Sequence, residues 1–498
     1  MISAVLFKKK MKPLRIYIEK SAKSTLDIDE IKYTFKTLLV TAGFGFVFTS
    51  DKNSEKIDIC YSKNPTEGCK MFIKMESVER ERIGIPVRVV RSNGLTLLSF
   101  TDDLENKEAI VRVEEGTYLL NDVILSTFYL LSGWQEKYVS RDRWDRHNIE
   151  EVYLYKKKML SEPLINCYAL FLKQMFTRYS EPLPLWPFGK KYGLALTHDV
   201  DYPDMICHIE TLRYMWACRG RTKVDKLLSI VTGKESFWRF SDWVALEKSK
   251  GLTSAFYFCG FKGSLFRYLF LAPDPFYDVK TPKFRELIRT LHGDGFEVGM
   301  HASYLSYRSP VVFASEKKTV EDALGAPVSG NRHHYWHMDP DNPADTAFIH
   351  DRIGLVYDSS LGFEKRCGFR RGICYPFHIY SSDEKHSANT LQLPPSLMDD
   401  HLFGHASYSH FKDWKIEIDA LLDVVRDVGG IFVTDYHVRG FNDTFYPGWR
   451  ESYEYLLERI TQRNDFYCDT PSNIAKYVLD RESKIMEISS DEDCPLDK

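Results

Sequence analysis

A chain of 498 residues is long for a single hydrophobic core, so its length predicts two domains and allows a third. Hydrophobic residues make up 44% and charged residues 28%, a balance that excludes a largely disordered chain. The formal net charge is −3 and the basic residues are scattered except in KKKMK at 8–12, which argues against nucleic acid as a partner.

The beginning of the chain lacks the pattern of a secretory signal. In MISAVLFKKKMK the short apolar run precedes the lysines, the reverse of the order in a signal peptide. No apolar stretch approaches the roughly 20 residues that span a bilayer. The ten cysteines include no CxxC pair, so a reducing compartment fits. We therefore expect a cytoplasmic protein without a transmembrane segment. KKKMK could still contact an acidic membrane surface, and the oligomeric state is left open.

The first part of the chain has the pattern of an α/β domain. LRIYIE, KIDICYS and LTLLSF predict strands, and DEIKYTFKTLLVTAG predicts a helix that ends at Gly43. Three prolines in EPLPLWPFGKK, residues 181–191, disfavour regular structure, and fourteen of the fifteen histidines lie beyond this stretch. We therefore place the first domain at 1–185. The sequence indicates no role for it.

Residues 186–482 alternate short apolar strands with helical stretches. The clearest units are LALTHD with TLRYMWACR, SAFYFCG with TPKFRELIRTLHGDG, EVGMHA with ASEKKTVEDALG, and IFVTDYH with GWRESYEYLLERITQR. Repeated strand and helix units predict a parallel sheet, here a (β/α) barrel. The predicted fold class is α/β, with a smaller α/β domain before the barrel. The acidic end of the chain, 483–498, is expected to be a disordered tail.

Aspartates and histidines follow four of the predicted strands. They are Asp199 and Asp201 after LALT, His301 after FEVGM, His333 and His334 in GNRHHYWH, and His437 after IFVTDY. Strand ends of a barrel meet at one mouth, so four such sites together indicate catalysis. A carboxylate and imidazoles can hold a divalent cation, while a second carboxylate accepts a proton from water. Because residues i and i+2 of a strand share a face, the DxD pair can divide these two roles.

The same motifs carry a family resemblance. THDVD at 197–201, GFEVGMHASY at 295–304, GNRHHY at 330–335 and TDYH at 434–437 resemble, in order and spacing, the motifs of the polysaccharide deacetylase family, also called the NodB homology domain or carbohydrate esterase family 4. The resemblance covers about residues 190–480. It implies a distorted (β/α) barrel that removes acetyl groups from N-acetylated sugars with a bound metal. Residues 358–377 and 441–457 are similar to a bacterial subgroup in which an α/β domain precedes this barrel.

The resemblance implies roles for individual residues. Asp199 matches the catalytic base, Arg332 the arginine that orients it, and His437 the histidine that acts as acid and stabilises the oxyanion. Asp201 and His301 match metal ligands. The two aspartates are adjacent in most family members, whereas one residue separates them here, as in some members.

One ligand position departs from the family pattern. The second histidine ligand normally lies four residues after the first, and that position is Leu305, which cannot bind a cation. His334 could supply the missing imidazole, and we prefer it to His333. Tyr304 and Trp336 are expected to contact the sugar, with Trp336 as a platform for the ring, although aromatic residues at a barrel mouth are also often packing.

We therefore expect a metal-dependent N-deacetylase that uses metal-bound water, with zinc as the metal and cobalt or nickel as alternatives. The expected substrate is an N-acetylated sugar precursor of a surface polysaccharide, linked to a nucleotide or a lipid. Two alternatives stay open. One is a catalytically inactive carbohydrate-binding barrel that lost its metal because of Leu305, and the other is hydrolysis of an O-acetyl ester or a cyclic amide by the same attack.

Overall fold

The computed structural model describes residues 11–20, 24–52, 57–66, 68–80, 83–101, 109–113, 116–205, 210–212, 214–215, 224–233, 235–264, 266–267, 274–403 and 414–490. Parts of KKKMK, of TLRYMWACR and of the predicted tail lie outside these residues. The chain forms two compact units. The first consists of Met1–Gly189, Arg371–Ala388 and Lys476–Lys498, and the second of Lys190–Arg370 and Asn389–Ala475. The predicted boundary lies close to Gly189, but residues 371–388 and 476–482, which we expected in the barrel, belong to the first unit, as do the residues of the expected tail.

The first unit is an α/β fold. Its elements are β1 (Leu14–Ile18), α2 (Ile28–Ala42), β2 (Phe46–Thr49), β3 (Ile59–Ser62), β4 (Met71–Lys74), β5 (Arg88–Ser92), β6 (Leu95–Ser99), β7 (Ile110–Val113), β8 (Gly116–Leu119), α3 (Val123–Leu131), α4 (Tyr153–Lys156), α5 (Leu164–Phe176) and β14 (Phe377–Ser381). Six strands form one sheet in the order β2-β1-β3-β4-β8-β7, and β5 pairs with β6. The helix predicted to end at Gly43 is confirmed as α2, because Gly43 adopts a φ of 96° and its N–H donates to Leu39 O.

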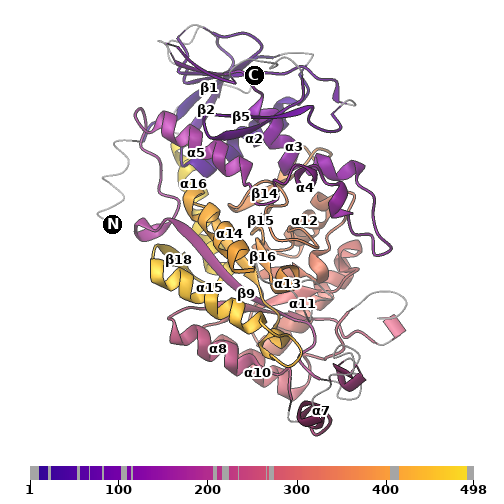
Figure 1. Ribbon diagram of the computed structural model, residues 1–498. Helices are drawn as coiled ribbons and strands as arrows, with labels where there is room; N and C mark the ends of the chain where they lie inside the picture. Colours follow the sequence, from indigo (N-terminus) through magenta and orange to yellow (C-terminus); the bar gives the residue numbers. More distant parts are fainter. Residues whose placement is uncertain are drawn as a thin grey trace. The chain divides into compact units, whose positions relative to one another are not determined.

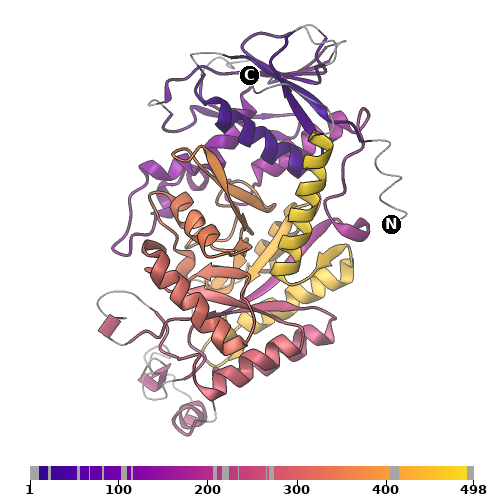
Figure 2. The same ribbon diagram turned by 180° about the vertical axis from the view of Figure 1, so that it is seen from behind.

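The second unit contains the strands with the predicted site residues. Its elements are β9 (Tyr192–Val200), α7 (Val224–Val231), α8 (Phe240–Ser249), β10 (Ser254–Cys259), α10 (Pro282–Gly293), β11 (Glu297–Ala302), α11 (Pro310–Leu324), β12 (Gly330–His333), α12 (Pro343–Arg352), β13 (Tyr357–Asp358), β15 (His386–Gln392), β16 (Leu397–Met398), α13 (Asp399–Phe403), α14 (Trp414–Val428), β17 (Ile431–Asp435), α15 (Trp449–Arg463), β18 (Phe466–Cys468) and the start of α16 (Pro471–Ser490). Helices α8, α10, α11, α14 and α15 surround these strands (Figures 1 and 2).

The strands of the second unit form a parallel sheet in the order β15-β13-β12-β11-β10-β9-β17-β16, with β18 beside the first half of β9. All nine residues of β9 are buried, as expected for a central parallel strand covered on both faces. The pairing path does not return on itself within the described part of the chain. The predicted α/β class is therefore confirmed, and the expected barrel is an open, curled sheet.

The end of the chain differs from the prediction. Residues 483–490, expected in a disordered tail, form the last turns of α16, and Ile485 in this segment is fully buried. Residues 491–498 lie outside the described residues. Among the helices that the structure describes, none is long and apolar enough to cross a membrane.

Candidate active site

Neighbouring parallel strands bring the predicted residues to one rim of the sheet. Asp199 of β9 pairs in register with Tyr257 of β10, and His301 of β11 with Arg332 of β12. β17 pairs with the other side of β9, and His437 follows β17 by two residues. Because the carboxyl ends of parallel strands lie at one edge, these side chains converge there.

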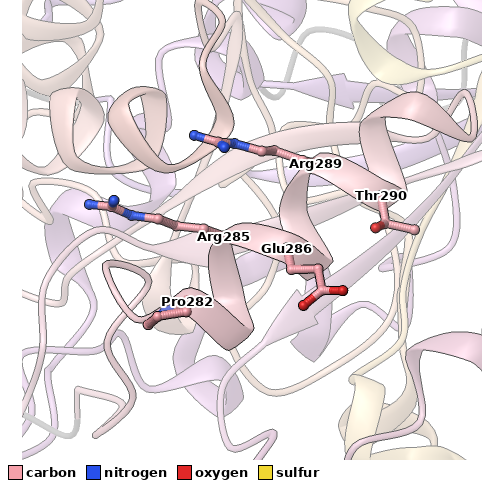
Figure 3. A pocket seen from close by; sticks show the side chains of 5 residues that line it. All are labelled: Pro282, Arg285, Glu286, Arg289 and Thr290. Carbon is pink, nitrogen blue, oxygen red and sulfur yellow. The ribbon is translucent and has the colours of Figure 1, made fainter.

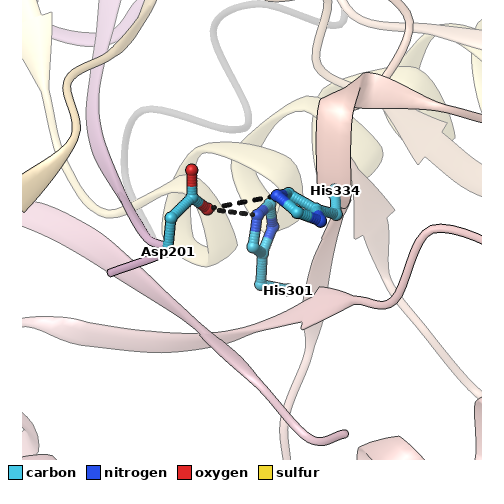
Figure 4. A group of neighbouring side chains, drawn as sticks. All are labelled: Asp201, His301 and His334. Carbon is cyan, nitrogen blue, oxygen red and sulfur yellow. Dashed lines mark hydrogen bonds and ion pairs between the residues drawn. The ribbon is translucent and has the colours of Figure 1, made fainter. Parts of the chain in front are cut away.

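Asp201 lies at the centre of a buried group of imidazoles. Its Oδ1 is 3.1 Å from Nε2 of His301 and 3.7 Å from Nε2 of His334 (Figure 4). The ligand atoms of these three residues all lie within 4.8 Å of one another. Burial would raise the pKa of Asp201, but the charges of His437 and His334 outweigh it and hold this pKa well below its usual value. The structure thus brings together the three residues predicted as ligands, and their role as ligands stays a prediction.

The hydrogen bonds of the two imidazoles suit metal binding. His301 Nδ1 lies 2.9 Å from the carbonyl oxygen of Arg332, which can only accept, so Nδ1 carries a proton and Nε2, hydrogen-bonded to Asp201 Oδ1, is the atom that a metal would use. His334 Nδ1 faces the buried carboxylate of Asp274 at 3.5 Å. Metal-bound histidines normally donate their other N–H to a carbonyl or carboxylate in this way. One carboxylate and two imidazoles therefore fit zinc, cobalt or nickel.

His334, and not Leu305, lies in the group with Asp201 and His301. Leu305 lies directly before the short helix η5 (Ser306–Arg308) and offers no ligand atom. His334 begins the next short helix, η6 (His334–Trp336), at the end of β12. Tyr335 and Trp336 both adopt left-handed φ values, 58° and 56°, which are costly for bulky side chains. Such strain concentrates at functional sites, and here it belongs to the turn that carries His334.

Asp199 lies beside this group and is held by Arg332. Arg332 Nη1 donates to Asp199 Oδ1 at 3.1 Å and to Thr197 Oγ1 at 2.6 Å. Its other nitrogens donate to the carbonyl and hydroxyl oxygens of Ser359 at 2.9 and 3.0 Å. Burial would raise the pKa of Asp199, but the charges of His301 and Arg332 outweigh it and lower this pKa. Asp199 is thus an ionised, oriented carboxylate that can accept a proton.

His437 is oriented by a carboxylate that the sequence analysis missed. Asp399 Oδ1 lies 2.7 Å from His437 Nδ1, and Asp399 Oδ2 accepts the His437 backbone N–H at 2.7 Å. His437 Nε2 consequently faces Asp201 Oδ2 at 3.1 Å. Burial would lower the pKa of His437, but the charge of Asp399 outweighs it and raises this pKa well above its usual value. His437 can therefore hold a proton on Nε2 at the cluster.

Arg439 is a second residue that the sequence analysis missed. Its Nη1 donates to Asp201 Oδ2 at 3.0 Å, the same oxygen that His437 faces. Arg439 also lies over the rings of Tyr202 and Tyr446. The sequence predicted one functional residue in the loop after β17, His437. Arg439, two positions later, is part of no motif that would have indicated its role.

The two residues predicted to contact the sugar are buried. Trp336 is 1% exposed and its indole N–H donates to Asp435 Oδ2 at 3.1 Å, so it offers no open platform. Tyr304 is 3% exposed and its ring stacks on His337 at 4.3 Å, while its backbone N–H donates to Asp274. Trp336 thus holds the buried carboxylate of Asp435, and Tyr304 holds that of Asp274, which faces His334.

His333 faces the other side of β12, away from Asp201. Its Nε2 lies 2.9 Å from Nε2 of His350, and burial lowers the pKa of both rings, so they form a neutral hydrogen-bonded pair. Asp358 lies close enough to complete a second group of three metal-type ligands. However, its carboxylate already accepts from Asn331 Nδ2 and from the N–H and hydroxyl of Ser360. This group is therefore explained as a hydrogen-bonded part of the core.

A hollow of about 570 Å³ lies on the surface of α10 (Figure 3). It is lined by Pro282, Arg285, Glu286, Arg289 and Thr290. None of the predicted site residues lines it. The helix precedes β11, so the hollow belongs to the outer layer of helices and not to the rim that carries Asp201.

Comparisons with known proteins describe parts of the chain. Residues 15–181 match a family model described as a family of unknown function, DUF7033. No curated protein matches the chain. Solved structures similar to this one include provisionally assigned polysaccharide deacetylases from Mycobacterium smegmatis (18% identity, 60% of this chain and 93% of that chain, TM-score 0.39) and Pseudomonas aeruginosa PAO1 (14%, 60% and 95%, 0.39). Another is PuuE allantoinase (13%, 60% and 94%, 0.40). The evidence for the chemistry of this chain is therefore the arrangement of its own side chains.

Proposed function

We propose that the chain is a metal-dependent hydrolase that removes the acetyl group from an N-acetylated sugar. The observation that carries this proposal is the convergence of Asp201, His301 and His334 beside a separately held carboxylate, Asp199. Asp201, His301 and His334 would hold the metal. When bound, the metal lowers the pKa of water and polarises the carbonyl of the amide.

The side chains divide the remaining work. Asp199 accepts the proton of the attacking water, and Arg332 keeps this carboxylate ionised and oriented. His437 Nε2 lies across the cluster and donates a proton to the departing amine, while the carboxylate of Asp399 accepts from Nδ1 and stabilises the imidazolium from which this proton comes. The same N–H can stabilise negative charge on the carbonyl oxygen. A base and an acid on opposite sides of Asp201 support hydrolysis over simple carbohydrate binding.

One observation favours a second candidate, a carbohydrate-binding protein without catalysis. Arg439 places its positive charge 3.0 Å from Asp201 Oδ2, where it competes with a cation for the carboxylate. The proposal of an enzyme requires that zinc bind in spite of Arg439. Asp201 Oδ1 faces both imidazoles and is the oxygen open to this role.

Acetate release tests the proposed function. The zinc-loaded chain is incubated with an N-acetylated sugar and, separately, with an O-acetylated sugar. We expect acetate from the amide and its loss in Asp199→Asn, because this change removes the proton acceptor and keeps the shape. Release from the ester alone would instead identify an O-deacetylase, and release from neither would favour the binding protein. That the sugar is a nucleotide-linked or lipid-linked precursor of a surface polysaccharide is part of the proposal.

A further inference from the structure

The carboxylate of Asp274 lies behind His334 and is fully buried. Its Oδ1 is 3.5 Å from His334 Nδ1, the ring nitrogen that does not face Asp201. Neither His334 Nδ1 nor Asp274 Oδ2 has a hydrogen-bond partner among the residues that the structure describes. Because burying polar atoms without partners is costly, the imidazole and the carboxylate are placed to satisfy each other.

The backbone around Asp274 is fixed independently of His334. Asp274 Oδ1 accepts the backbone N–H of Tyr304, in the loop after β11, at 2.8 Å. Gly263, in the loop after β10, donates its N–H to the carbonyl oxygen of Pro275 at 2.6 Å. A Cβ at Gly263 would lie 2.3 Å from the carbonyl oxygen of Asp274, so the two segments are in close contact. The carboxylate is thus held in place from two sides.

One cation lies near this carboxylate. Arg267 Nη2 is 3.7 Å from Asp274 Oδ2, which is too far for a hydrogen bond, and its guanidinium lies over the ring of Phe261 at 4.7 Å. The side chain of Arg267 is 34% exposed, so solvent screens its charge. Asp274 therefore remains able to accept a hydrogen bond from His334.

The position of Asp274 matters because His334 lies between two carboxylates. Asp201 Oδ1 is 3.7 Å from its Nε2, and Asp274 Oδ1 is 3.5 Å from its Nδ1. A neutral imidazole binds a cation only through the ring nitrogen that carries no proton. We propose that Asp274 is a positioning residue that keeps the proton of His334 on Nδ1 and leaves Nε2 to hold the metal beside Asp201. This inference rests on the proposed function, because it concerns the same metal site.

The same contact gives the loop after β11 a part in the site. Leu305 offers no ligand atom, but Tyr304, directly before it, donates to Asp274. The loop therefore supports a ligand, His334, instead of supplying one itself.

Calorimetric titration of the metal-free chain with zinc tests this role. Asp274→Asn keeps the shape and an acceptor for the N–H of Tyr304, but it removes the charge that holds the proton on His334 Nδ1. We expect the zinc affinity to fall about 10- to 100-fold. The visible absorption of the cobalt-loaded chain depends on its ligands, so in Asp274→Asn it should shift toward that of His334→Ala. Asp278→Asn, the same change four residues later, is the control and binds zinc like the wild type.

The His334→Ala background separates positioning from general support of the fold. There, Asp274→Asn should change the zinc affinity less than about twofold, because no imidazole is left for Asp274 to hold. The inference is overturned if Asp274→Asn lowers the affinity equally in both backgrounds, or if it has no effect in the wild type.

Activity separates this inference from the proposed function. A chain that shows the expected zinc affinities but releases no acetate leaves the inference standing and counts against the proposed function alone. A chain that releases acetate, and whose Asp274→Asn variant binds zinc like the wild type, does the reverse.

Discussion

At the scale of single residues, the site depends on side chains that orient other side chains. The residues that face the cluster, Asp199, Asp201, His301 and His437, could be proposed from the sequence because each follows an apolar strand. Asp399 could not. It follows β16, which has only two residues, and so short a strand leaves no periodic signal in the sequence.

His334 shows a different limit. The sequence identified the missing ligand at Leu305 and offered two neighbouring histidines in its place. Which of these two histidines faces Asp201 depends on how side chains alternate between the two faces of β12 and on the strained turn after this strand.

Asp399→Asn tests the orienting role of this carboxylate. The amide keeps the shape but lacks the negative charge that stabilises the imidazolium, so His437 loses the doubly protonated form that can donate a proton from Nε2. We expect kcat for acetate release to fall about 10²- to 10⁴-fold. We expect KM to stay nearly unchanged. If Asp399 had only a structural role, its substitution would change KM as well. Asp400→Asn, the same change one residue later, is the control. Equal kcat in Asp399→Asn and the wild type would contradict the role.

At the scale of elements, the sequence located the central strands β9, β10, β11 and β17 and the helices α10, α11 and α15 of the second unit, since buried parallel strands are apolar runs. The sequence did not predict the last turns of α16. The acidic residues near the terminus indicated a disordered tail, and Ile485, a single buried residue in helical register, was too weak a signal for a helix. The sequence also could not show how α11 is attached to the end of β11. That attachment is Glu316, a buried carboxylate that accepts from the N–H of Ser303 at 2.8 Å and from its hydroxyl at 2.5 Å.

Glu316→Gln should change how stability depends on pH. Burial raises the pKa of Glu316 to about 7, from an ordinary value of 4.5. The unfolded chain therefore releases this proton first, and the wild type loses stability relative to Glu316→Gln as the pH rises from about 4.5 to 7, by up to about 3 kcal/mol. Thermal unfolding of both proteins at pH 5 and pH 8 measures the difference. A difference in stability that is the same at both pH values would contradict a raised pKa.

At the scale of the whole molecule, the first unit is discontinuous in sequence. Arg481, near the end of the chain, donates to the carbonyl oxygens of Val40, Leu183 and Pro184 at 2.7, 3.2 and 2.9 Å. Contacts between residues so far apart leave no local pattern, so composition placed a simple boundary at 185. The structure instead completes the first unit with Arg371–Ala388 and Lys476–Lys498.

A fragment of residues 1–185 should consequently fail to fold cooperatively. It lacks α16, so it loses the three hydrogen bonds of Arg481 and the packing of the fully buried Ile485. We expect a broad thermal transition by circular dichroism and rapid proteolysis, compared with a sharp transition in the full chain. A fragment that unfolds as cooperatively as the full chain would show that the first 185 residues are a complete domain.

The central claim is that His334 completes a metal site with Asp201 and His301, and calorimetric titration of the metal-free chain with zinc tests it most directly. We expect one zinc per chain in the wild type and at least about a 100-fold weaker affinity in His334→Ala. His386→Ala, which removes an exposed imidazole, should bind like the wild type. A wild type that binds no zinc at micromolar concentration, or a His334→Ala variant with unchanged affinity, would contradict the account.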